Sequence, residues 1–277
     1  MLKWLALIIM TIDHIGYYFY PHLSEPVYYA LRIAGRLAFP IFAFYIVKGF
    51  SRTSNPGKYI IRMASWAVIA HFAISAAGVW TGRQTSVFDI SWTNVLVLFT
   101  FAIIMLAGYD IAMRSYHDMV ASMTLACNPP ARIKDPRYDV KVNPGGLTMS
   151  PRFGILAGIL MMLGSFWFVD VLNADYEVYG LLMILLINIS YCAEDNKICL
   201  STLTGSLLLL NAAYVAMAAF AGENIRFTLI QTVSVLAVLL FNVIPEPRKK
   251  PSFVSKYFFY IYYPAHIAAL IFISSVL

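Results

Sequence analysis

Nine apolar stretches occupy most of the chain, and they limit its fold more than any other feature. A helix of about 20 apolar residues is long enough to cross the hydrocarbon core of a bilayer. The sequence therefore predicts an all-α fold, a polytopic transmembrane helix bundle of about nine spans. The predicted spans are 2–20, 28–49, 59–79, 91–112, 153–171, 177–193, 199–221, 225–244 and 254–276.

The overall composition supports a membrane protein and excludes an ordinary soluble domain. Of the 277 residues, 60% are apolar and 12% are charged, and the mean hydropathy is +0.72. The first stretch carries Asp13 and His14 and precedes no small-residue cleavage site, so we interpret it as a retained helix. The three cysteines show no metal-ligand spacing, and we predict no metal site. Residues 1–277 are predicted to form a single membrane domain.

Positively charged residues indicate how the bundle is oriented. With nine spans, 16 of the 20 Lys and Arg residues fall on one side, whereas Arg83 and Arg226 fall on the other. Cytoplasmic loops carry such an excess, so we predict a cytoplasmic N-terminus and an extracytoplasmic C-terminus. The connection 113–152 is rich in Pro, Gly and charge, and is predicted to be a cytoplasmic loop, irregular apart from a helical first part. The net charge of +6 follows from this topology and from lipid contacts, so we expect no nucleic acid partner.

Ionisable residues inside the apolar spans mark a candidate functional site. An ionisable side chain at membrane depth is costly unless a partner or water meets it. Lys3 and His14 are 11 residues apart in the first predicted span. Three helical turns place them on one face, about 16 Å apart along the axis. The spacing therefore predicts a cation at the membrane surface and an imidazole deep below it, with Asp13 beside the imidazole.

The second and ninth predicted spans add further polar groups at a similar depth. Arg32 and Arg36 lie four residues apart, on one helix face in the outer half of the second span. Antiparallel packing of the first two spans would bring Arg36 level with His14. In the ninth span His266 follows Pro264, which frees a backbone carbonyl. We predict a polar pocket in the outer half of the bundle, including three residues at the outer starts of other spans: Asn94, Asp175 and Tyr176.

Structural roles for the same residues stay open on sequence grounds. An arginine in a membrane also binds backbone carbonyls at a helix break, and Arg32 is also placed to reach outer headgroups. A neutral buried histidine also joins two helices through a hydrogen bond, which applies to His266. Asp13 points about 100° away from His14, so its partner is either that residue or Arg36.

Several blocks of sequence resemble the TraX family, the pilin acetylation proteins of conjugative systems. They are Lys-Trp-Leu-Ala-Leu-Ile-Ile-Met-Thr-Ile-Asp-His-Ile-Gly at 3–16, Arg-Ile-Ala-Gly-Arg-Leu-Ala-Phe-Pro-Ile-Phe-Ala-Phe at 32–44 and Lys-Tyr-Ile-Ile-Arg at 58–62. The segment Lys-Tyr-Phe-Phe-Tyr-Ile-Tyr-Tyr-Pro-Ala-His at 256–266 is similar to the ending of that family. The Lys3-x10-His14 spacing also resembles the Arg/Lys-x10-His signature of membrane acyltransferases that acylate extracytoplasmic sugars.

The resemblance implies an acetyl-CoA-dependent N-acetyltransferase of the bacterial inner membrane that acetylates the N-terminal amine of pilin. His14 is then expected to be the general base, with Asp13, Arg36 and His266 as further catalytic residues. Acetyl-CoA, as co-substrate, is expected to bind Lys3, Arg32, Arg62 and Tyr263. The acceptor is expected at Asn94, Asp175 and Tyr176. The implied partners are acetyl-CoA, a pilin subunit and membrane lipid.

Two other functional classes fit the same residues. Paired Arg, His and Asp inside a bundle also describe a proton- or anion-coupled transporter, although the sequence shows no clear internal repeat. A non-catalytic membrane subunit of a secretion or pilus assembly system would use the polar residues to hold helices together. For an enzyme, a pilin amine, a sugar hydroxyl and a lipid headgroup all suit a pocket that opens outward.

Overall fold

The computed structural model describes residues 2–127, 150–192, 197–222, 225–241 and 253–277, and these are almost entirely helical. The elements in this part of the chain are α1 (Leu2–Tyr18), η1 (Tyr20–His22), α2 (Glu25–Gly35), α3 (Ala38–Ser51), α4 (Pro56–Trp80), α5 (Val95–Cys127), α6 (Pro151–Val171), α7 (Glu177–Ser190), α8 (Leu200–Ala221), α9 (Ile225–Gln231), η2 (Thr232–Ala237), α10 (Val238–Phe241) and α11 (Phe253–Val276). One antiparallel pair of two-residue strands, β1 (Tyr191–Cys192) and β2 (Lys197–Ile198), joins α7 to α8.

Six helical segments are long and apolar enough to cross a membrane, which supports a multi-pass membrane protein. They are 25–51, 56–80, 95–123, 151–171, 200–221 and 257–276. The other three predicted spans coincide with shorter segments. α1 has 17 residues, α7 has 14, and the eighth span is reduced to the apolar helix Thr228–Phe241. The prediction of an all-α fold is confirmed, whereas the count of about nine spans stays a prediction.

Helix boundaries follow from local capping chemistry. The side chain of Asn55 accepts a hydrogen bond from the Lys58 amide (2.9 Å), and Pro56 occupies the first turn of α4. α8 ends at Gly222, whose φ of 72° lies in the left-handed region that terminates helices. Both signals are readable in the sequence.

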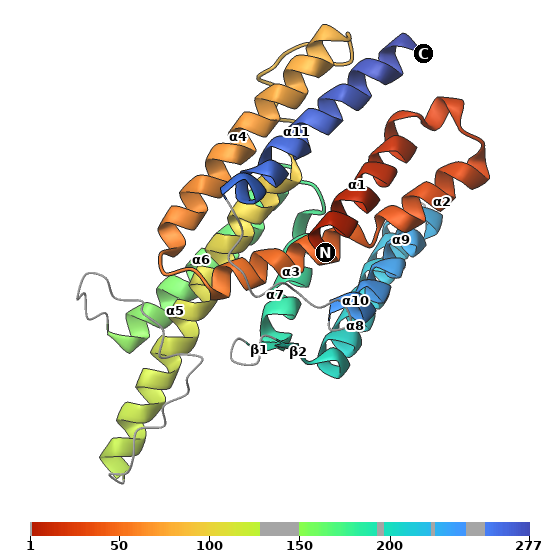
Figure 1. The fold of residues 1–277 in the computed structure, drawn as a ribbon. Coiled ribbons are helices and arrows are strands. Elements are labelled where there is room, and N and C mark those ends of the chain that lie inside the picture. Colours follow the sequence, from red (N-terminus) through yellow and green to blue (C-terminus); the bar gives the residue numbers. More distant parts are fainter. Residues whose placement is uncertain (1, 128–149, 193–196, 223–224, 242–252) are drawn as a thin grey trace.

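The second predicted span, 28–49, is broken, which corrects the prediction of one continuous helix. α2 ends at Gly35 and α3 begins at Ala38, and the two helices meet at an angle (Figure 1). Pro40 has no amide hydrogen to donate to the Arg36 carbonyl, and its ring would clash with that carbonyl in a continuous helix. The amides of Arg36 and Leu37 instead bind carbonyls three residues back, at 3.2 and 3.3 Å. The break places Arg36 at a helix junction.

The eighth predicted span, 225–244, also departs from regular α-helix. Residues Thr232–Ala237 form a 3₁₀ helix of six residues between α9 and α10. Runs of that length are uncommon, and in mid-helix they often mark a hinge or strain. Gln231, the last residue of α9, is buried at this change of helix type.

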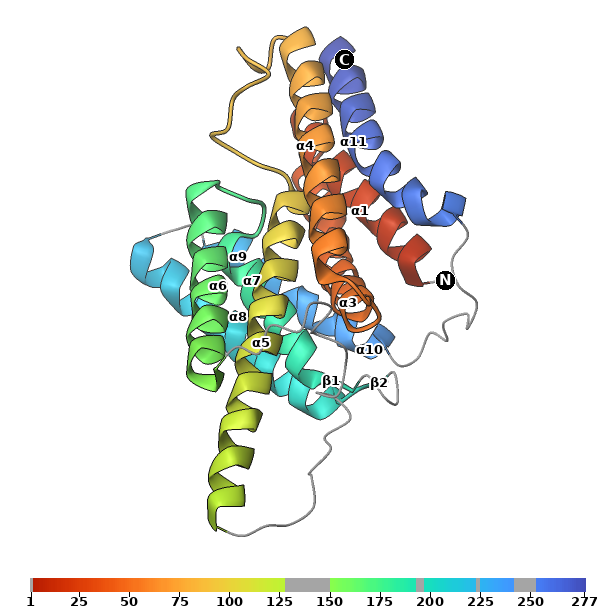
Figure 2. The same ribbon diagram turned by 90° about the vertical axis from the view of Figure 1, so that its left-hand side faces the viewer.

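α5 and α6 form an extensive antiparallel pair through small residues. A Cβ atom on Gly158 would collide with the Gly108 carbonyl and with Ala112 on α5. Such close approach of backbones is the usual way in which helices associate in membranes. α5 runs on to Cys127, beyond the lower end of α6 (Figure 2), so the helical first part predicted for 113–152 is present. The remainder of that predicted loop, up to 149, lies outside the described residues.

The remaining helices surround the apolar core from both sides. α4 and α11 lie side by side, and α11 also contacts α1 (Figure 1). Residues of α1, α3, α4, α5, α7 and α11 share one apolar cluster. The ends of α4 and α11 extend well beyond the neighbouring ends of α6 and α7 (Figure 2). The connection after α4 therefore runs down to the start of α5, deep within the fold.

Candidate functional site

A small cavity lies where α1, the α2–α3 junction, α5, the α6–α7 connection and α11 meet. Its volume is about 60 Å³, which suits a few waters or an acetyl-sized group but not a whole coenzyme. The lining residues are Met10, Asp13, His14, Gly35, Ala38, Phe39, Phe42, Val95, Phe99, Asp175, Tyr176 and Tyr263. The wall is therefore mostly apolar, with a few polar groups that converge on one point, which is typical of a ligand site.

Asp13 is bound by two arginines on one side of this cavity. Arg32 Nη1 donates to one carboxylate oxygen at 2.8 Å, and Arg36 Nη2 donates to both oxygens at 2.9 and 3.1 Å. All three side chains are buried. The sequence left open whether Asp13 pairs with His14 or Arg36, and the structure pairs it with Arg36. Two guanidinium groups against one carboxylate give this cluster a net charge of +1.

Gly35 permits this cluster to form. A Cβ atom at that position would collide with the carboxylate, Cγ and Cβ of Asp13. The absence of a side chain thus allows α1 and α2 to approach until the arginines reach Asp13. Breaking such a buried ion group leaves an uncompensated charge, which is strongly destabilising.

Arg36 also begins a chain of hydrogen bonds that the sequence did not predict. Its Nη1 donates to Gln231 Oε1 at 3.0 Å, and Gln231 Nε2 lies 3.4 Å from the Tyr179 hydroxyl. That hydroxyl is 3.1 Å from both Asn211 Oδ1 and Ser234 Oγ. All of these side chains are buried. Polar residues inside apolar spans were the available signal, but uncharged side chains are common there as helix contacts.

His14 and His266 are joined by a hydrogen bond of 2.9 Å between His14 Nδ1 and His266 Nε2. The other ring nitrogen of His266, Nδ1, lies 2.8 Å from the backbone carbonyl of Tyr262. A carbonyl only accepts, so His266 Nδ1 carries hydrogen and its Nε2 accepts from His14 Nδ1. The neutral pair therefore leaves Nε2 of His14 with a free lone pair, as a general base requires.

The acidic side of the cavity comes from the α6–α7 connection. Asp175 and Tyr176 line the cavity, and the Val95 amide at the start of α5 donates to the Asp175 carboxylate. Three non-glycine residues of this short segment have positive φ: Asn173 (43°), Tyr176 (66°) and Glu177 (42°). Backbone in this region costs about 1–3 kcal/mol per residue and clusters at functional sites.

Tyr176 covers the arginine side of the cavity. Its ring stacks on Phe39 with centroids 4.0 Å apart, and the Arg36 guanidinium carbon lies 5.9 Å from the ring centroid. The irregular backbone on either side is held by the 93–95 segment, because Thr93 binds Asn173 and Asp175 through its backbone. Irregular backbone inside a membrane bundle is tolerated where neighbouring protein satisfies its hydrogen bonds, as the 93–95 segment does here.

Three helices begin at the cavity wall. α3 starts at Ala38, α5 at Val95 and α7 directly after Tyr176, and each of these residues lines the cavity. The amino end of a helix carries a partial positive charge. Together with the excess arginine, these ends make the cavity favourable for negative charge.

Lys3 and Arg62 do not line the cavity, and each contacts an aromatic residue in the first part of α11. Lys3 Nζ is 4.6 Å from the Tyr45 ring centroid and 5.5 Å from that of Phe259. Arg62 hydrogen bonds to Tyr260, the next residue of α11. The two predicted cofactor-binding cations thus contact aromatic residues that are adjacent in the sequence of α11.

The remaining predicted site residues divide into two groups. Tyr263 lines the cavity, whereas the head group of Arg32 is engaged by Asp13. Asn94 is buried and does not line the cavity, so its role at the acceptor site stays a prediction. Its amide nitrogen donates to the Ala67 carbonyl and its oxygen accepts from the Leu96 amide, both at about 3 Å. Asn94 therefore caps α5 and ties it to α4.

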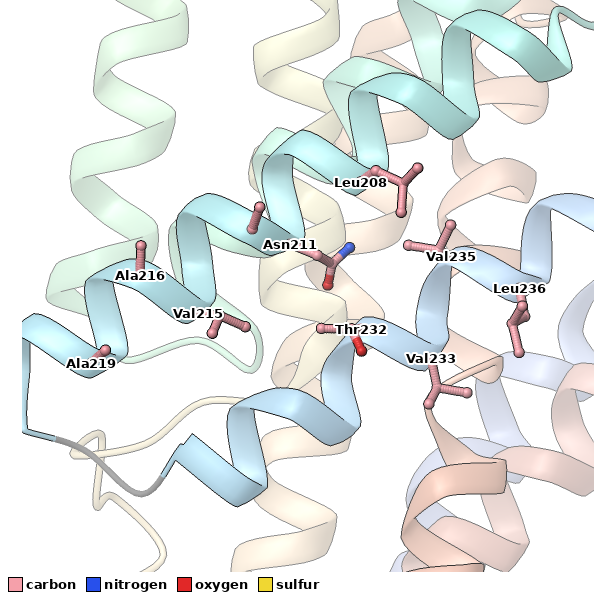
Figure 3. A pocket seen from close by; sticks show the side chains of 10 residues that line it. Leu208, Asn211, Val215, Ala216, Ala219, Thr232, Val233, Val235 and Leu236 are labelled. Carbon is pink, nitrogen blue, oxygen red and sulfur yellow. The ribbon is translucent and has the colours of Figure 1, made fainter.

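A larger hollow lies elsewhere, between α8 and η2, with a volume of about 740 Å³. Figure 3 shows Leu208, Val215, Val233 and Val235 around it, with the Asn211 amide near its centre. The hollow is open and almost wholly apolar. No titratable side chain lines it, so its lining offers no acid or base for catalysis. Among the described residues, no group of three His, Cys, Asp or Glu is placed to bind a metal ion.

The fold and the site define a multi-pass membrane protein with a small, mostly apolar cavity, lined by a few polar groups that include His14 of a hydrogen-bonded histidine pair. Comparison of the whole sequence shows its family. Residues 1–274 match the TraX protein family, and the chain belongs to that family.

Two relatives are similar over shorter segments. An uncharacterized protein of Rickettsia prowazekii (strain Madrid E) is 46% identical over 61 residues, 22% of each chain. A protein of Dichelobacter nodosus named "Probable fimbrial assembly protein FimC, serogroup H1" is 39% identical over 69 residues, 25% of this chain and 28% of that protein. The similar segments thus span about a quarter of each relative. No solved structure matches the chain.

Proposed function

We propose that this protein is a membrane-embedded acetyltransferase. It would move an acetyl group from cytoplasmic acetyl-CoA to an acceptor on the outer side, with the N-terminal amine of pilin as the first candidate. Membership of the TraX family and the fimbrial assembly name of one relative support a pilus-related role. The observation that carries the proposal is the His14–His266 hydrogen bond at the wall of an acetyl-sized cavity.

In the proposed reaction His14 acts as the general base. The acceptor nitrogen attacks the thioester carbonyl, a C–N bond forms, and the C–S bond then breaks. His14 Nε2 takes a proton from the nitrogen and returns it to the leaving sulfur. His266 holds His14 in the required tautomer through the 2.9 Å hydrogen bond. Negative charge on the carbonyl oxygen and the sulfur develops beside the excess arginine and the three helix starts, which stabilise it.

Asp13, Arg32 and Arg36 have a different role in this proposal. Three nitrogens of Arg36 already donate, to Asp13, Gln231 and the Arg32 carbonyl. Arg36 therefore acts on the reaction through its charge rather than through a direct hydrogen bond to substrate. Asp13 keeps both arginines in place and limits the net charge of the cluster to +1.

The coenzyme is proposed to bind from the cytoplasmic end of α1. A charged nucleotide does not enter hydrocarbon, but the uncharged pantetheine arm can extend along a helix. The rise from Lys3 to His14 is about 16 Å, which is of the same order as that arm. Lys3 and Arg62 would hold phosphate groups, and Tyr263 would contact the thioester end. Arg32 is the weakest of the predicted coenzyme contacts, because Asp13 binds its head group.

The proposal includes an orientation in the bacterial inner membrane. Successive spans alternate in direction, so nine passes would put the two termini on opposite faces, and the excess of Lys and Arg on the N-terminal side would make that side cytoplasmic. The cavity would then open to the outer face, beside the α6–α7 connection. A sugar hydroxyl or a lipid headgroup remains an alternative acceptor.

Replacement of His14 tests the proposal directly. The purified protein is incubated with labelled acetyl-CoA and a peptide that has a pilin-like free N-terminus. We expect label in the peptide with the parent protein, and a loss of about 100-fold or more with His14→Ala, because general base catalysis contributes that much. His22→Ala is the matched control, since His22 is exposed in η1 and should retain full activity.

Two outcomes would contradict the proposal. Transfer at the parent rate by a folded His14→Ala protein would remove His14 from the mechanism. Absence of transfer with the parent protein, together with proton or anion flux in reconstituted vesicles, would favour a transporter. In that case the chain from Asp13 through Gln231 to Tyr179 would be the natural ion pathway.

A further inference from the structure

The positive charge on the arginine side of the cavity creates a difficulty for an amine acceptor. An N-terminal amine is largely an ammonium ion near neutral pH. The excess arginine and the three helix starts repel such a cation. An ammonium ion also has no lone pair with which to attack a thioester. The amine therefore has to be attracted and then deprotonated before it reaches His14.

The stoichiometry of the reaction adds a second demand. An ammonium has three N–H bonds and the amide product has one. Two protons must leave, and His14 Nε2 can hold only one of them at a time. A second base near the outer opening of the cavity would remove the other proton.

We infer that Asp175 is this second base and the recognition group for a cationic amine acceptor. Asp175 and His14 line the same cavity, and Asp175 is exposed whereas the Asp13 carboxylate is buried. Asp13 is fully engaged by two arginines, but Asp175 has no salt bridge among the described residues. This inference rests on the acetyl transfer proposed above and assigns the acceptor end of the same site.

The backbone holds the Asp175 carboxylate at this position. The Val95 amide at the start of α5 donates to it, and the helix end favours a negative charge. Left-handed backbone at Asn173 and Tyr176 bends the short connection on either side of Asp175, which lines the cavity. The ionisable groups that surround Asp175 are Asp13, His14, Tyr18, Arg36, Tyr176 and Tyr263.

The proposed sequence of proton transfers is balanced. The ammonium binds the Asp175 carboxylate and gives it one proton, which passes to outer water. The neutral amine then attacks the thioester carbonyl, and its second proton passes to His14 Nε2. The C–S bond breaks and the sulfur receives that proton, which yields the amide and CoA thiol.

The test compares a cationic and an uncharged acceptor with the full-length protein. The cationic acceptor is a short peptide with a free N-terminal amine, and the uncharged one is hydroxylamine. For Asp175→Asn we expect kcat/KM with the peptide to fall about 100-fold at pH 7, as loss of one acid–base group does. With hydroxylamine kcat/KM should change less than about threefold, because no ammonium has to be bound or deprotonated.

A pH profile separates a chemical role from a structural one. As pH rises the peptide amine loses its proton in solution, so Asp175→Asn should recover toward the parent activity. Asp170→Asn is the matched control, because Asp170 is exposed on α6 just before the same connection. It should behave as the parent protein with both acceptors.

The possible outcomes distinguish the two proposals. An equal loss with both acceptors and no recovery at high pH, or no loss with either, would overturn the role of Asp175. If Asp175→Asn fails to fold, Asp175→Glu keeps the charge, and it should retain the preference for the peptide. If His14→Ala loses transfer to both acceptors, that result bears on acetyl transfer itself. The role of Asp175 is decided separately, by comparing Asp175→Asn with the two acceptors.

Discussion

At the scale of single residues, the site depends on which side-chain atoms already have a hydrogen-bond partner and which do not. Asp13 and Arg36 are saturated by each other and by their neighbours, so they set charge and position. His14 keeps one free ring nitrogen because His266 occupies the other. The chemistry is thereby concentrated on one atom, and its orientation depends on the Tyr262 carbonyl four residues before His266.

This dependence predicts the behaviour of a His266→Gln variant. Glutamine does not hold His14 in one tautomer as the imidazole of His266 does. We therefore expect kcat of the proposed transfer to fall about 10- to 100-fold, with little change in KM for acetyl-CoA. Steady-state kinetics with varied acetyl-CoA measures both quantities. A rise in KM with unchanged kcat would instead indicate that His266 contacts the coenzyme.

At the same scale, some predicted site residues line the cavity and others do not. Residues of the first, second, fourth, sixth and ninth predicted spans were expected to share one polar pocket, and His14, Asp175, Tyr176 and Tyr263, from three parts of the chain, do line one cavity. The depth of an ionisable residue in a span was enough for that prediction. Asn94 does not line this cavity, because its amide side chain bonds the backbone at the start of α5, and spacing does not distinguish a helix cap from a ligand contact.

At the scale of helices, the positions of the spans were predictable and their breaks were not. Apolar length locates α4, α6 and α8 to within a few residues. The break after Gly35 had a signal in Pro40, but a proline in the first turn of a new helix and one inside a kinked helix look alike in sequence. The 3₁₀ segment Thr232–Ala237 had no local signal, since its geometry accompanies tertiary bonds to Gln231 and Ser234.

The α5–α6 contact gives a prediction about stability. In Gly158→Leu the new side chain would meet the Gly108 carbonyl and Ala112, and overpacking of this kind costs about 1–3 kcal/mol. We expect a lower thermal unfolding midpoint in detergent, by about 2–12 °C, measured by circular dichroism. Gly164→Leu on the same helix is the control, because nothing lies within 4 Å of a Cβ there. Equal midpoints for the two variants would show that the close contact does not matter.

At the scale of the whole molecule, the orientation in the membrane decides whether the two substrates can meet. The proposed topology puts Lys3 and the α7–α8 connection on the cytoplasmic side and the 81–94 connection outside. Charge bias alone supports this orientation. A chemical label on one exposed residue at each side would establish it.

Cys199 provides such a label site. Hydrogen bonds to the side chains of Ser201 and Thr202 lower the pKa of this exposed thiol from 9.0 to about 7. In a Cys127→Ser, Cys192→Ser background, we expect a membrane-impermeant maleimide to label inverted vesicles but not intact cells. Because the thiolate is half formed near pH 7, the labelling rate should rise through that pH and level off above about 8. Mass spectrometry measures the labelled fraction.

The reverse pattern is expected for a cysteine on the other side. Thr85→Cys, in a background that also carries Cys199→Ser, replaces an exposed residue of the 81–94 connection. It should react in intact cells and be protected in sealed inverted vesicles. Labelling of Cys199 from outside the cell would invert the topology and place the coenzyme end on the wrong side.

The convergence of α3, α5 and α7 on one cavity has a consequence for how this chain tolerates mutation. Part of the local potential originates in peptide groups, which every residue type possesses. Substituting a side chain can weaken or outweigh this contribution to the potential, but it does not remove it. The contribution of the peptide groups depends on where the three helices begin, and only a change in the fold would remove it.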